Sequence, residues 1–470
     1  MTVQEFDLII IGSGSGNSLI NEEWDDKKVA IIDGGTFGGT CLNFGCIPTK
    51  QYVYPATVAH HATHSGHLGL EAEVTKVDWP AMRDRIFSRI DAISSGGLDY
   101  RLGLDNVTVF QEYVKFVDTH TLETASGARL SAPQIVIAAG SRNVLPEVPG
   151  INSKNVETSD TVMRIDDLPQ RVVVIGGGFI AAEFSHVFSA LGAEVTQAVR
   201  TDVVLRGYDT EITDRFKREA AQQWNLRLNH VLKEIRDEQD GSSTVIFDHE
   251  GETVEVEADL VLVAAGRTPN SDTLAAEKFF DVRENKTIAV DRYHRVLAGG
   301  EVVEGVFALG DVSSDYMLKH VANAETRTVQ YNLTHPDSLR STDERFVPAA
   351  VFTSPQIATV GLSEDDARSA AEREGFEITV KVQNFGDVAY GWAMEDSAGL
   401  CKLIARKDTG DLLGAHLIGE ESSILIQPLI QAMSFGLKVQ DMARGQFWIH
   451  PALTEVVENA LLGLEIDSAQ

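Results

Sequence analysis

Two cysteines five positions apart, Cys41 and Cys46, are the residues of this chain best suited to covalent chemistry. They follow a glycine-rich run at 34–39 and precede an apolar, helix-competent stretch. If Cys41 opens that helix, Cys46 lies one turn further along it, and the two sulfur atoms can come close enough to bond. The amino terminus of a helix carries a partial positive charge, which favours thiolate over thiol. The spacing therefore favours a disulfide that opens and closes during turnover, with two buried apolar cysteines as the alternative.

Charge and cysteine usage limit the classes of function open to this chain. Its 470 residues suffice for about three domains of ordinary size. The net charge of −30 would repel nucleic acid and anionic membranes, so neither is expected as a partner. No apolar run is long enough to span a bilayer, and residues 1–5 do not resemble a signal peptide, so we expect a cytoplasmic protein. Of three cysteines, the last, Cys401, sits in a strand-like run and is expected to be inert core.

The amino-terminal segment alternates strand and helix patterns around a glycine-rich turn. We expect a buried strand at 6–11, a turn at 12–17, a helix to about Glu23, and a second strand at 29–32 that ends on Asp33. An acid about 20 residues after the first glycine of such a unit is the fingerprint of dinucleotide binding.

The residues of this turn have distinct parts in binding a dinucleotide. Gly12 permits the tight turn, and Gly14 lets backbone amides approach a pyrophosphate at the helix amino terminus. Asp33 is suited to accept a ribose hydroxyl. Asn17 occupies the third glycine position, which weakens the match without breaking it. The alternative is a glycine-rich loop that binds nothing.

A group of histidines follows the cysteines, at His60, His61, His64 and His67. Three of them could share one helix face, so a metal site is conceivable. No acid or cysteine completes such a site, and the spacing of the cysteine pair is not that of a metal knuckle. We therefore expect no bound metal.

The strand and glycine-turn pattern then occurs a second time. A strand at 171–175 leads into Gly176 and Gly178, followed by a helix at 179–191 and a strand at 194–199. Two dinucleotide sites on one chain imply two cofactors that pass electrons between them.

The end of this second unit indicates which nucleotide it binds. Val199 stands where an acid would select NAD, and Arg200 and Arg206 follow. Because guanidinium groups suit a 2′-phosphate, the second site is predicted to prefer NADPH. The alternative is a pair of solvated surface arginines.

The rest of the chain supplies one acid and one histidine that could take part in the chemistry. A strand at 305–310 ends on Asp311, which could bind a ribityl or ribose hydroxyl or belong to a surface turn. From about residue 346 strands and helices alternate with fewer glycines, which indicates a separate α+β domain. In its tail His450 precedes a proline, with Glu455 five positions on. That pair could be a proton donor oriented by a carboxylate, or a loop histidine beside a helix cap.

Taken in order, these segments resemble the pyridine-nucleotide-disulfide oxidoreductases over essentially the whole chain. The segment from 38 to 50, the paired glycine turns, the Ala-Ala-Gly-Arg-Thr-Pro-Asn run at 264–270, the Leu-Gly-Asp at 309–311 and the His-Pro tail are similar to those of glutathione reductases, dihydrolipoamide dehydrogenases and mercuric reductases. The asparagine-third turn and the tail at 448–462 are similar to those of the mycothione reductases.

The resemblance implies roles by position. Cys41 would attack the substrate disulfide, and Cys46 would face the flavin as a thiolate. Lys50 would lie beside the flavin ring, paired with Glu183. His450 and Glu455 would come from the partner subunit of a homodimer. The implied FAD contacts are Gly12, Gly14, Asp33 and Asp311. The implied NADPH contacts are Gly176, Gly178, Arg200 and Arg206, with Phe179 over the nicotinamide pocket. Further cofactor candidates are Asn17, Thr40, Gly140, Gly266 and Arg267.

The implied fold is α/β, with two Rossmann-like dinucleotide-binding domains, for FAD and NADPH, and a carboxyl-terminal α+β dimerisation domain. The expected boundaries are 1–150 and 267–345 for the two parts of the FAD domain, 151–266 for the NADPH domain and 346–470 for dimerisation. The implied activity is NADPH-dependent reduction of a low-molecular-weight disulfide, mycothione first of all.

Three alternatives differ from this activity. A dihydrolipoamide dehydrogenase would use NAD and lipoamide and would carry an acid at position 199. A glutathione-type reductase would differ only in its disulfide. A flavin-bound protein without turnover would not need Cys41, Cys46, His450 and Glu455 together, so it is disfavoured.

Overall fold

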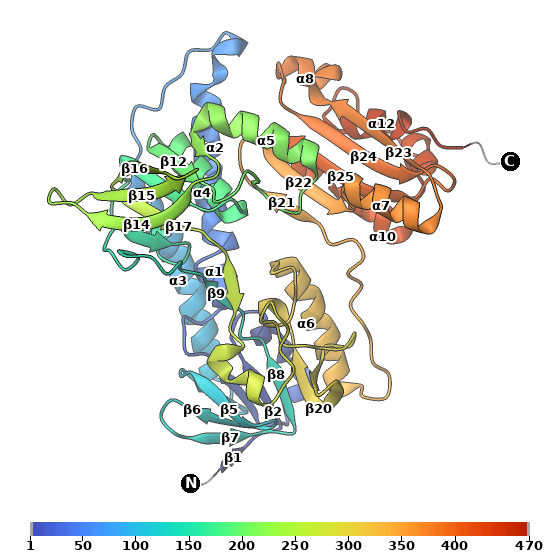
Figure 1. Cartoon of the computed structure of the whole chain (residues 1–470). Helices are drawn as coiled ribbons and strands as arrows, with labels where there is room; N and C mark the ends of the chain where they lie inside the picture. Colours follow the sequence, from blue (N-terminus) through green and yellow to red (C-terminus); the bar gives the residue numbers. More distant parts are fainter. Residues whose placement is uncertain (1–2, 468–470) are drawn as a thin grey trace.

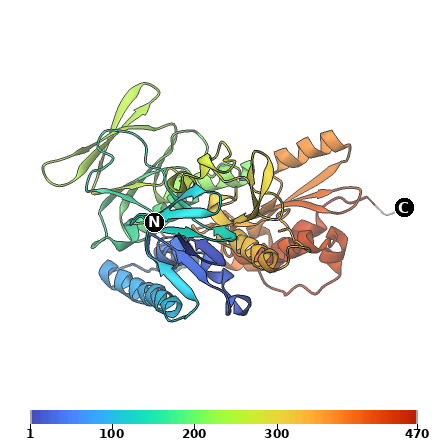
Figure 2. The ribbon, with the colours of Figure 1, turned by 90° about the horizontal axis from the view of Figure 1, so that it is seen from below.

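The computed structural model describes residues 3–467, which form three regions (Figure 1). The blue amino-terminal strands and the yellow-orange strands near residue 300 share one sheet at the lower end. The green segment from about 150 to 263 forms the second region, and residues from 349 onward form the third. Seen from below, the antiparallel strands of the second region and the third region lie on opposite sides (Figure 2). This arrangement confirms the predicted α/β class.

The first region is built on a six-stranded sheet of order β19-β20-β8-β2-β3-β4, parallel except for the β19–β20 pair. All residues of β2 and β3 are buried, as expected for isoleucine- and valine-rich strands covered on both faces. Ile11 pairs with Ile32 and with Ile137, so the loops after β2, β3 and β8 leave the same edge. The strands are β2 (Leu8–Ile11), β3 (Val29–Ile32), β4 (Val107–Phe110), β8 (Gln134–Ile137), β19 (Arg295–Ala298) and β20 (Glu301–Ala308).

The loop after β2 does not form the helix expected to reach about Glu23. Two 3-10 turns occur instead, η1 (Gly16–Leu19) and η2 (Glu22–Trp24). The side chain of Asn21 accepts a hydrogen bond from the Glu23 amide and so starts the second turn. Each turn ends on a buried apolar side chain. Tertiary packing of those two side chains therefore sets the local conformation here.

The cysteine segment also differs from expectation. Cys41 lies inside the short α1 (Gly39–Asn43), and α2 (Cys46–Thr63) begins at Cys46. The expectation that Cys41 opens one helix and Cys46 lies a turn inside it is wrong. The chain turns at Gly45, where a Cβ atom would lie 3.0 Å from a carbonyl oxygen of α1, which leaves little room for any side chain. As a result Cys46, and not Cys41, stands at the amino terminus of the long helix.

The second region repeats the plan of the first. Its five-stranded parallel sheet has the order β10-β17-β11-β12-β13. A Cβ atom on Gly12 would lie 2.2 Å from the Ala138 carbonyl oxygen, and one on Gly176 would lie 2.2 Å from that of Ala264. The two glycine turns are thus packed against equivalent strands. The elements are β10 (Val156–Thr158), β11 (Arg171–Ile175), α4 (Phe179–Ala190), β12 (Glu194–Ala198), α5 (Thr210–Gln223), β13 (Asn225–Arg227) and β17 (Leu260–Val263), with an antiparallel sheet of β14 (Val231–Asp237), β15 (Ser243–His249) and β16 (Glu252–Ala258).

Smaller elements complete and connect these regions. A two-stranded ribbon joins the first region to the second, and α6 and α3 pack beside the first sheet. The ribbon is β9 (Ser141–Asn143) and β18 (Arg267–Pro269); the others are β1 (Val3–Glu5), β5 (Val114–Asp118), β6 (Thr121–Thr124), β7 (Arg129–Ser131), α3 (Trp79–Leu102), α6 (Lys319–Thr334), η3 (Ser65–Leu68), η4 (Val162–Arg164), η5 (Asp272–Leu274), η6 (Ala276–Lys278) and η7 (Gly310–Val312).

The third region is an antiparallel sheet of order β21-β22-β25-β24-β23. Cys401 is fully buried in β24, as predicted. Pro428, which lacks an amide donor, lies in the first turn of the helix at 427–435, which follows a short helix at 422–425. The elements are β21 (Ala349–Val351), β22 (Gln356–Gly361), α7 (Glu364–Glu374), β23 (Ile378–Asn384), η8 (Phe385–Asp387), α8 (Ala389–Ala393), β24 (Leu400–Arg406), β25 (Leu412–Gly419), α9 (Ser422–Leu425), α10 (Gln427–Phe435), α11 (Val439–Arg444) and α12 (Thr454–Leu462).

The length and hydropathy of the helices bear on whether the chain could cross a membrane. Within residues 3–467 none combines the length and the apolar character that crossing a bilayer requires.

Candidate active site

A cavity of about 630 Å³ opens where the loops after β2, β3 and β8 meet. Its wall includes the first glycine turn, the loop after Asp33, both cysteines and part of α4. It lies at the carboxyl ends of parallel strands, where α/β sheets bind their ligands. Of the site candidates, it brings together Gly12, Gly14, Asp33, Thr40, Cys41, Cys46, Lys50, Gly140, Phe179, Glu183, Arg267 and Asp311.

The glycine turn is closely packed around the cavity edge. Gly12 has φ +105°, a conformation that few side chains adopt, and Gly14 lies so near Gly39 that a Cβ on the latter would be 2.6 Å from the Gly14 Cα. Lys319 of α6 donates from Nζ to Ser15 Oγ at 2.8 Å. This places a cation beside the turn where an anionic diphosphate would bind. Sequence spacing gave no sign of Lys319, which is about 300 residues away.

Asp33 is held at the end of β3 by hydrogen bonds. Its Oδ2 accepts from the backbone N–H of Ser13 at 2.8 Å and from Ser13 Oγ at 2.5 Å, and its Oδ1 accepts from the Gly35 amide at 2.8 Å. The carboxylate therefore faces the cavity in a fixed orientation.

Asn17 does not reach this cavity. Its side-chain oxygen accepts from Arg101 Nε at 2.8 Å, and its backbone carbonyl accepts from the same guanidinium at 2.7 Å. The close packing expected of a third glycine occurs one position earlier, at Gly16, where a Cβ would lie 2.7 Å from Ile10 Cγ2. Asn17 thus stabilises the turn through Arg101, away from the cavity. The third glycine of the Gly-Ser-Gly-Ser-Gly run, Gly16, is the sequence feature that could have predicted which residue packs closely here.

Cys41 and Cys46 are free thiols with different electrostatic surroundings. The hydrogen bond that Cys41 donates to Cys46 lowers the pKa of Cys46 to about 7, with help from the positive charge of Lys50 and against burial. The same hydrogen bond, followed by burial, raises the pKa of Cys41. Cys46 is therefore the thiolate of the pair near neutral pH.

Lys50 and Glu183 join the first region to the second. Lys50 Nζ lies 2.6 Å from each carboxylate oxygen of Glu183. Glu183 is only 3% exposed, and Lys50 is the cation that pairs with its buried carboxylate. The pair lines the cavity beside Cys46.

The ribbon between the regions carries the next group. Gly140 and Gly266 both have positive φ and precede its two strands. Arg267 donates from Nε to Ser141 Oγ at 2.9 Å, and that hydroxyl donates to Asp311 Oδ2 at 2.6 Å. This chain of contacts fixes Arg267 and Asp311 in the wall of the cavity.

The second glycine turn lies at the amino terminus of α4. Phe179, the first residue of α4, is 42% exposed and lines the cavity. Arg200 and Arg206 follow β12, are exposed, and form no ion pair within residues 3–467. Val199 is buried, and a Cβ on Gly177 would lie 2.7 Å from its Cγ1. An apolar side chain, packed against Gly177, thus stands at position 199, where an acid would select NAD.

His450 and Glu455 lie outside the cavity of their own chain. His450 Nδ1 donates to Glu455 Oε1 at 2.8 Å, and Nε2 has no hydrogen-bond partner among residues 3–467. The imidazole is 72% exposed in the single chain, whereas the carboxylate is 17% exposed. The histidine is oriented but not covered.

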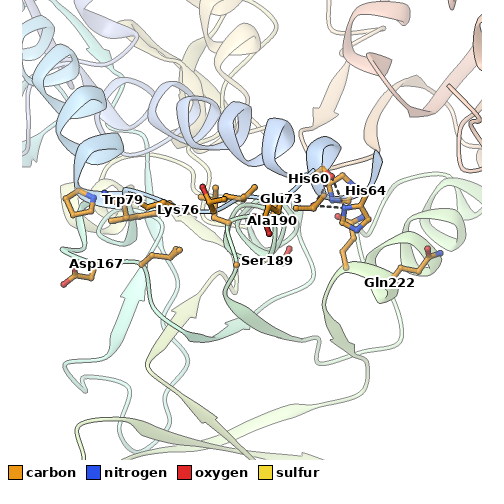
Figure 3. A pocket seen from close by; sticks show the side chains of 18 residues that line it. His60, His64, Glu73, Lys76, Trp79, Asp167, Ser189, Ala190 and Gln222 are labelled. Atoms are coloured by element: carbon orange, nitrogen blue, oxygen red, sulfur yellow. Dashed lines mark hydrogen bonds between the residues drawn. The ribbon is translucent and has the colours of Figure 1, made fainter. Parts of the chain in front are cut away.

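The other histidines lie at the far end of α2. His60 and His64 stack with ring centroids 4.0 Å apart, and His64 Nδ1 donates to the His60 carbonyl, beside a cavity of about 800 Å³ (Figure 3). Burial, then His64, lowers the pKa of His60 to about 3. His61 contacts Glu420 at 3.4 Å, and His67 contacts the Met394 carbonyl. No group of three or more metal-ligating side chains gathers in the described part of the chain.

A cavity at the carboxyl ends of a parallel sheet, a paired cysteine thiolate and a second nucleotide turn define a nucleotide-dependent disulfide oxidoreductase. The family model described as pyridine nucleotide-disulphide oxidoreductase matches residues 6–326, and the model of the family's dimerisation domain matches 347–461. The chain belongs to this family, and its dimerisation domain supports a homodimer.

Known relatives are similar in sequence to this chain over nearly its whole length. Mycothione reductase of Mycobacterium tuberculosis (strain CDC 1551 / Oshkosh) is 50% identical over 98% of this chain and 100% of its own. The chloroplastic dihydrolipoyl dehydrogenase 2 of Arabidopsis thaliana is 30% identical over 99% of this chain and 83% of its own. Among solved structures, the Cu(II) complex of the HOCl-induced flavoprotein disulfide reductase RclA of Escherichia coli has a TM-score of 0.84 and 26% identity, covering 98% of this chain and 99% of that one.

The enzyme uses FAD and NADPH, as its family membership implies. The residues present fit a flavin dinucleotide, because the crowded Gly12 turn, the fixed Asp33 carboxylate and Lys319 surround a cavity that ends at Cys46.

Proposed function

We propose that this enzyme reduces the disulfide of a low-molecular-weight thiol, mycothione to mycothiol, in the cytoplasm. The observation that carries the proposal is the Cys41–Cys46 pair, whose thiolate lies at the start of α2 beside Lys50 in the cavity. The 50% identity to a mycothione reductase supports this substrate. Bound FAD would supply the electron pair, taken from NADPH, that opens the Cys41–Cys46 disulfide.

The two thiols then act in sequence. Cys41 gives its proton to His450 of the partner subunit and attacks one sulfur of the substrate disulfide, which forms a mixed disulfide and releases one thiolate. Cys46 attacks the Cys41 sulfur, which releases the second thiolate and restores the intramolecular disulfide. Protonation of the two leaving thiolates completes the reaction, so one disulfide is reduced and one dithiol is oxidised.

The proton donor in this proposal is His450 of the other subunit. Glu455 holds Nδ1, so Nε2 is free to give a proton to a departing thiolate. Apolar side chains of the third region are exposed in the single chain, with Phe435 at 78%, Phe447 at 104% and Ile449 at 73%. Such a surface fits burial against a second copy, which would bring His450 to the partner's cysteines.

NADPH is the proposed electron donor in preference to NADH. Arg200 and Arg206 lie beyond β12 with their charges unpaired among residues 3–467, and Val199 removes the acid that would bind a ribose 2′-hydroxyl. Gly176, Gly178 and Phe179 would hold the rest of the nucleotide. We assign 1–150 and 267–345 to the FAD domain, 151–266 to the NADPH domain and 346–470 to dimerisation.

The test is an oxidation assay with NADPH and NADH, in which mycothiol, glutathione, trypanothione and lipoamide disulfides are compared side by side. We expect NADPH with mycothiol disulfide to give the highest kcat/KM. A preference for NADH and lipoamide would replace the proposal by a dihydrolipoamide dehydrogenase, and a preference for glutathione disulfide by a glutathione-type reductase.

A further inference from the structure

Phe352 lies where the third region meets the ion pair beside the cysteines. It directly follows β21 and is half-buried against the hydrophobic core that includes side chains of α2 and α4. Its backbone N–H donates to Glu183 Oε1 at 3.0 Å. Its ring centroid lies 4.6 Å from Lys50 Nζ. One residue of the dimerisation domain thus touches both members of the pair.

These contacts define the surroundings of the Lys50 ammonium group. Two of its directions are occupied by the Glu183 carboxylate oxygens, each at 2.6 Å, and the Phe352 ring occupies another. A cation is attracted to the face of an aromatic ring, and more strongly where water is excluded. The ring therefore covers one side of the ammonium group of a side chain that is 35% exposed.

We propose that Phe352 is a positioning residue, whose ring holds the Lys50 ammonium group where its charge stabilises the Cys46 thiolate. The inference rests on the proposed function, in which Cys46 resolves the mixed disulfide. The third region thereby sets the reactivity of a cysteine in the first.

The titratable groups around Cys46 come from three helices: Cys41 on α1, Lys50 on α2 and Glu183 on α4. Lys319 of α6 acts on Cys41, and Glu183 acts on Tyr208. Cys41 and then Lys50 lower the pKa of Cys46, whereas burial and then Glu183 raise it. Phe352 carries no charge, so its effect passes through the position and hydration of Lys50.

The experiment measures the Cys46 thiolate in the FAD-loaded, full-length Cys41→Ser enzyme, where the serine hydroxyl can still donate to Cys46. The rate of iodoacetamide alkylation is followed against pH, and the modified peptide is identified by mass spectrometry. Phe352→Leu keeps the backbone donor and removes the ring, so the alkylation midpoint should rise by about 0.5 pH unit. Phe352→Tyr keeps the ring and should restore the parent midpoint.

An unchanged midpoint in Phe352→Leu would overturn the inference. If that variant does not retain FAD, Phe352→Met provides the same comparison. In a Lys50→Gln background Phe352→Leu should cause no further shift, and an equal shift there would also overturn it. If the wild-type enzyme showed no NADPH-dependent disulfide reduction while the midpoint still depended on Phe352, the proposed function alone would be refuted, so the two failures are distinguishable.

Discussion

Cys41 and Cys46 have the same side chain and opposite electrostatic surroundings. Cys46 begins α2, accepts the hydrogen bond of its neighbour and faces the charge of Lys50, so its pKa falls to about 7. Cys41 is the donor of that bond, and its pKa is raised. Two sulfurs in one short segment can therefore take the separate tasks of nucleophile and stabilised thiolate.

Replacing Cys41 separates flavin binding from turnover. Cys41→Ser should bind FAD normally and lose disulfide reduction by at least about 10³-fold, because the thiol that attacks the substrate is gone. The flavin-to-protein absorbance ratio and NADPH oxidation with the disulfide measure the two effects. Cys401→Ala, in the buried strand β24, is the matched control and should keep turnover. Wild-type rates in Cys41→Ser would remove Cys41 from the mechanism.

The pH response of Cys46 follows from the sign of its shift. Since its pKa is lowered to about 7, the thiolate predominates above about pH 7, and the alkylation rate should fall to half near pH 7 and decline further below it. Lys50→Gln should move this midpoint upward by up to about 1 unit, because an attractive charge is lost. Iodoacetamide rates in the Cys41→Ser background give both midpoints, and equal midpoints would contradict the role of Lys50.

At the scale of elements, the sequence patterns predict the repeated units well. The predicted strand at 171–175 is β11, and the predicted helix at 179–191 is α4 to within one residue. The errors occur at the loop after β2 and at Gly45, where packing of side chains distant in sequence, or of one carbonyl group, decides the conformation. Local periodicity carries no information about such contacts.

The residues of the site also divide into those that local sequence patterns mark and those that they do not. The cysteines and the glycine turns carry local patterns and were predictable. Lys319 and Phe352 reach the site only through the topology, as the donor to Ser15 and as the ring over Lys50. No spacing in the chain marks them.

The first glycine turn should be intolerant of any side chain. Gly12→Ala should lose FAD and destabilise the fold by at least about 2 kcal/mol, because its Cβ would lie 2.2 Å from the Ala138 carbonyl oxygen at φ +105°. Gly96→Ala, in the interior of α3 with open space around it, is the control and should stabilise by about 0.5–1 kcal/mol. Urea unfolding and the flavin absorbance ratio test both. A flavin-loaded, stable Gly12→Ala would show that the turn is not packed in this way.

At the scale of the whole molecule, the reactive parts are divided among the three regions. The first supplies both cysteines, the second supplies Glu183, and the third supplies Phe352 within the same chain. His450, also in the third region, is oriented by Glu455 yet lies outside the cavity of its own chain and is open to solvent. A single chain therefore holds every group for the thiol steps except a proton donor.

Mixed dimers decide whether the active site is shared between subunits. Cys41→Ser and His450→Ala homodimers should each be nearly inactive. If each site takes its cysteines from one chain and its histidine from the other, a mixed dimer has one intact site. An equimolar mixture refolded or co-expressed to random pairing should then recover about a quarter of the wild-type NADPH oxidation rate. If histidine and cysteines of one chain work together, both sites of the mixed dimer are defective, and the mixture stays inactive. Mixing Cys41→Ser with Cys46→Ser is the control, since both changes fall on the same side of each site and no pairing restores activity.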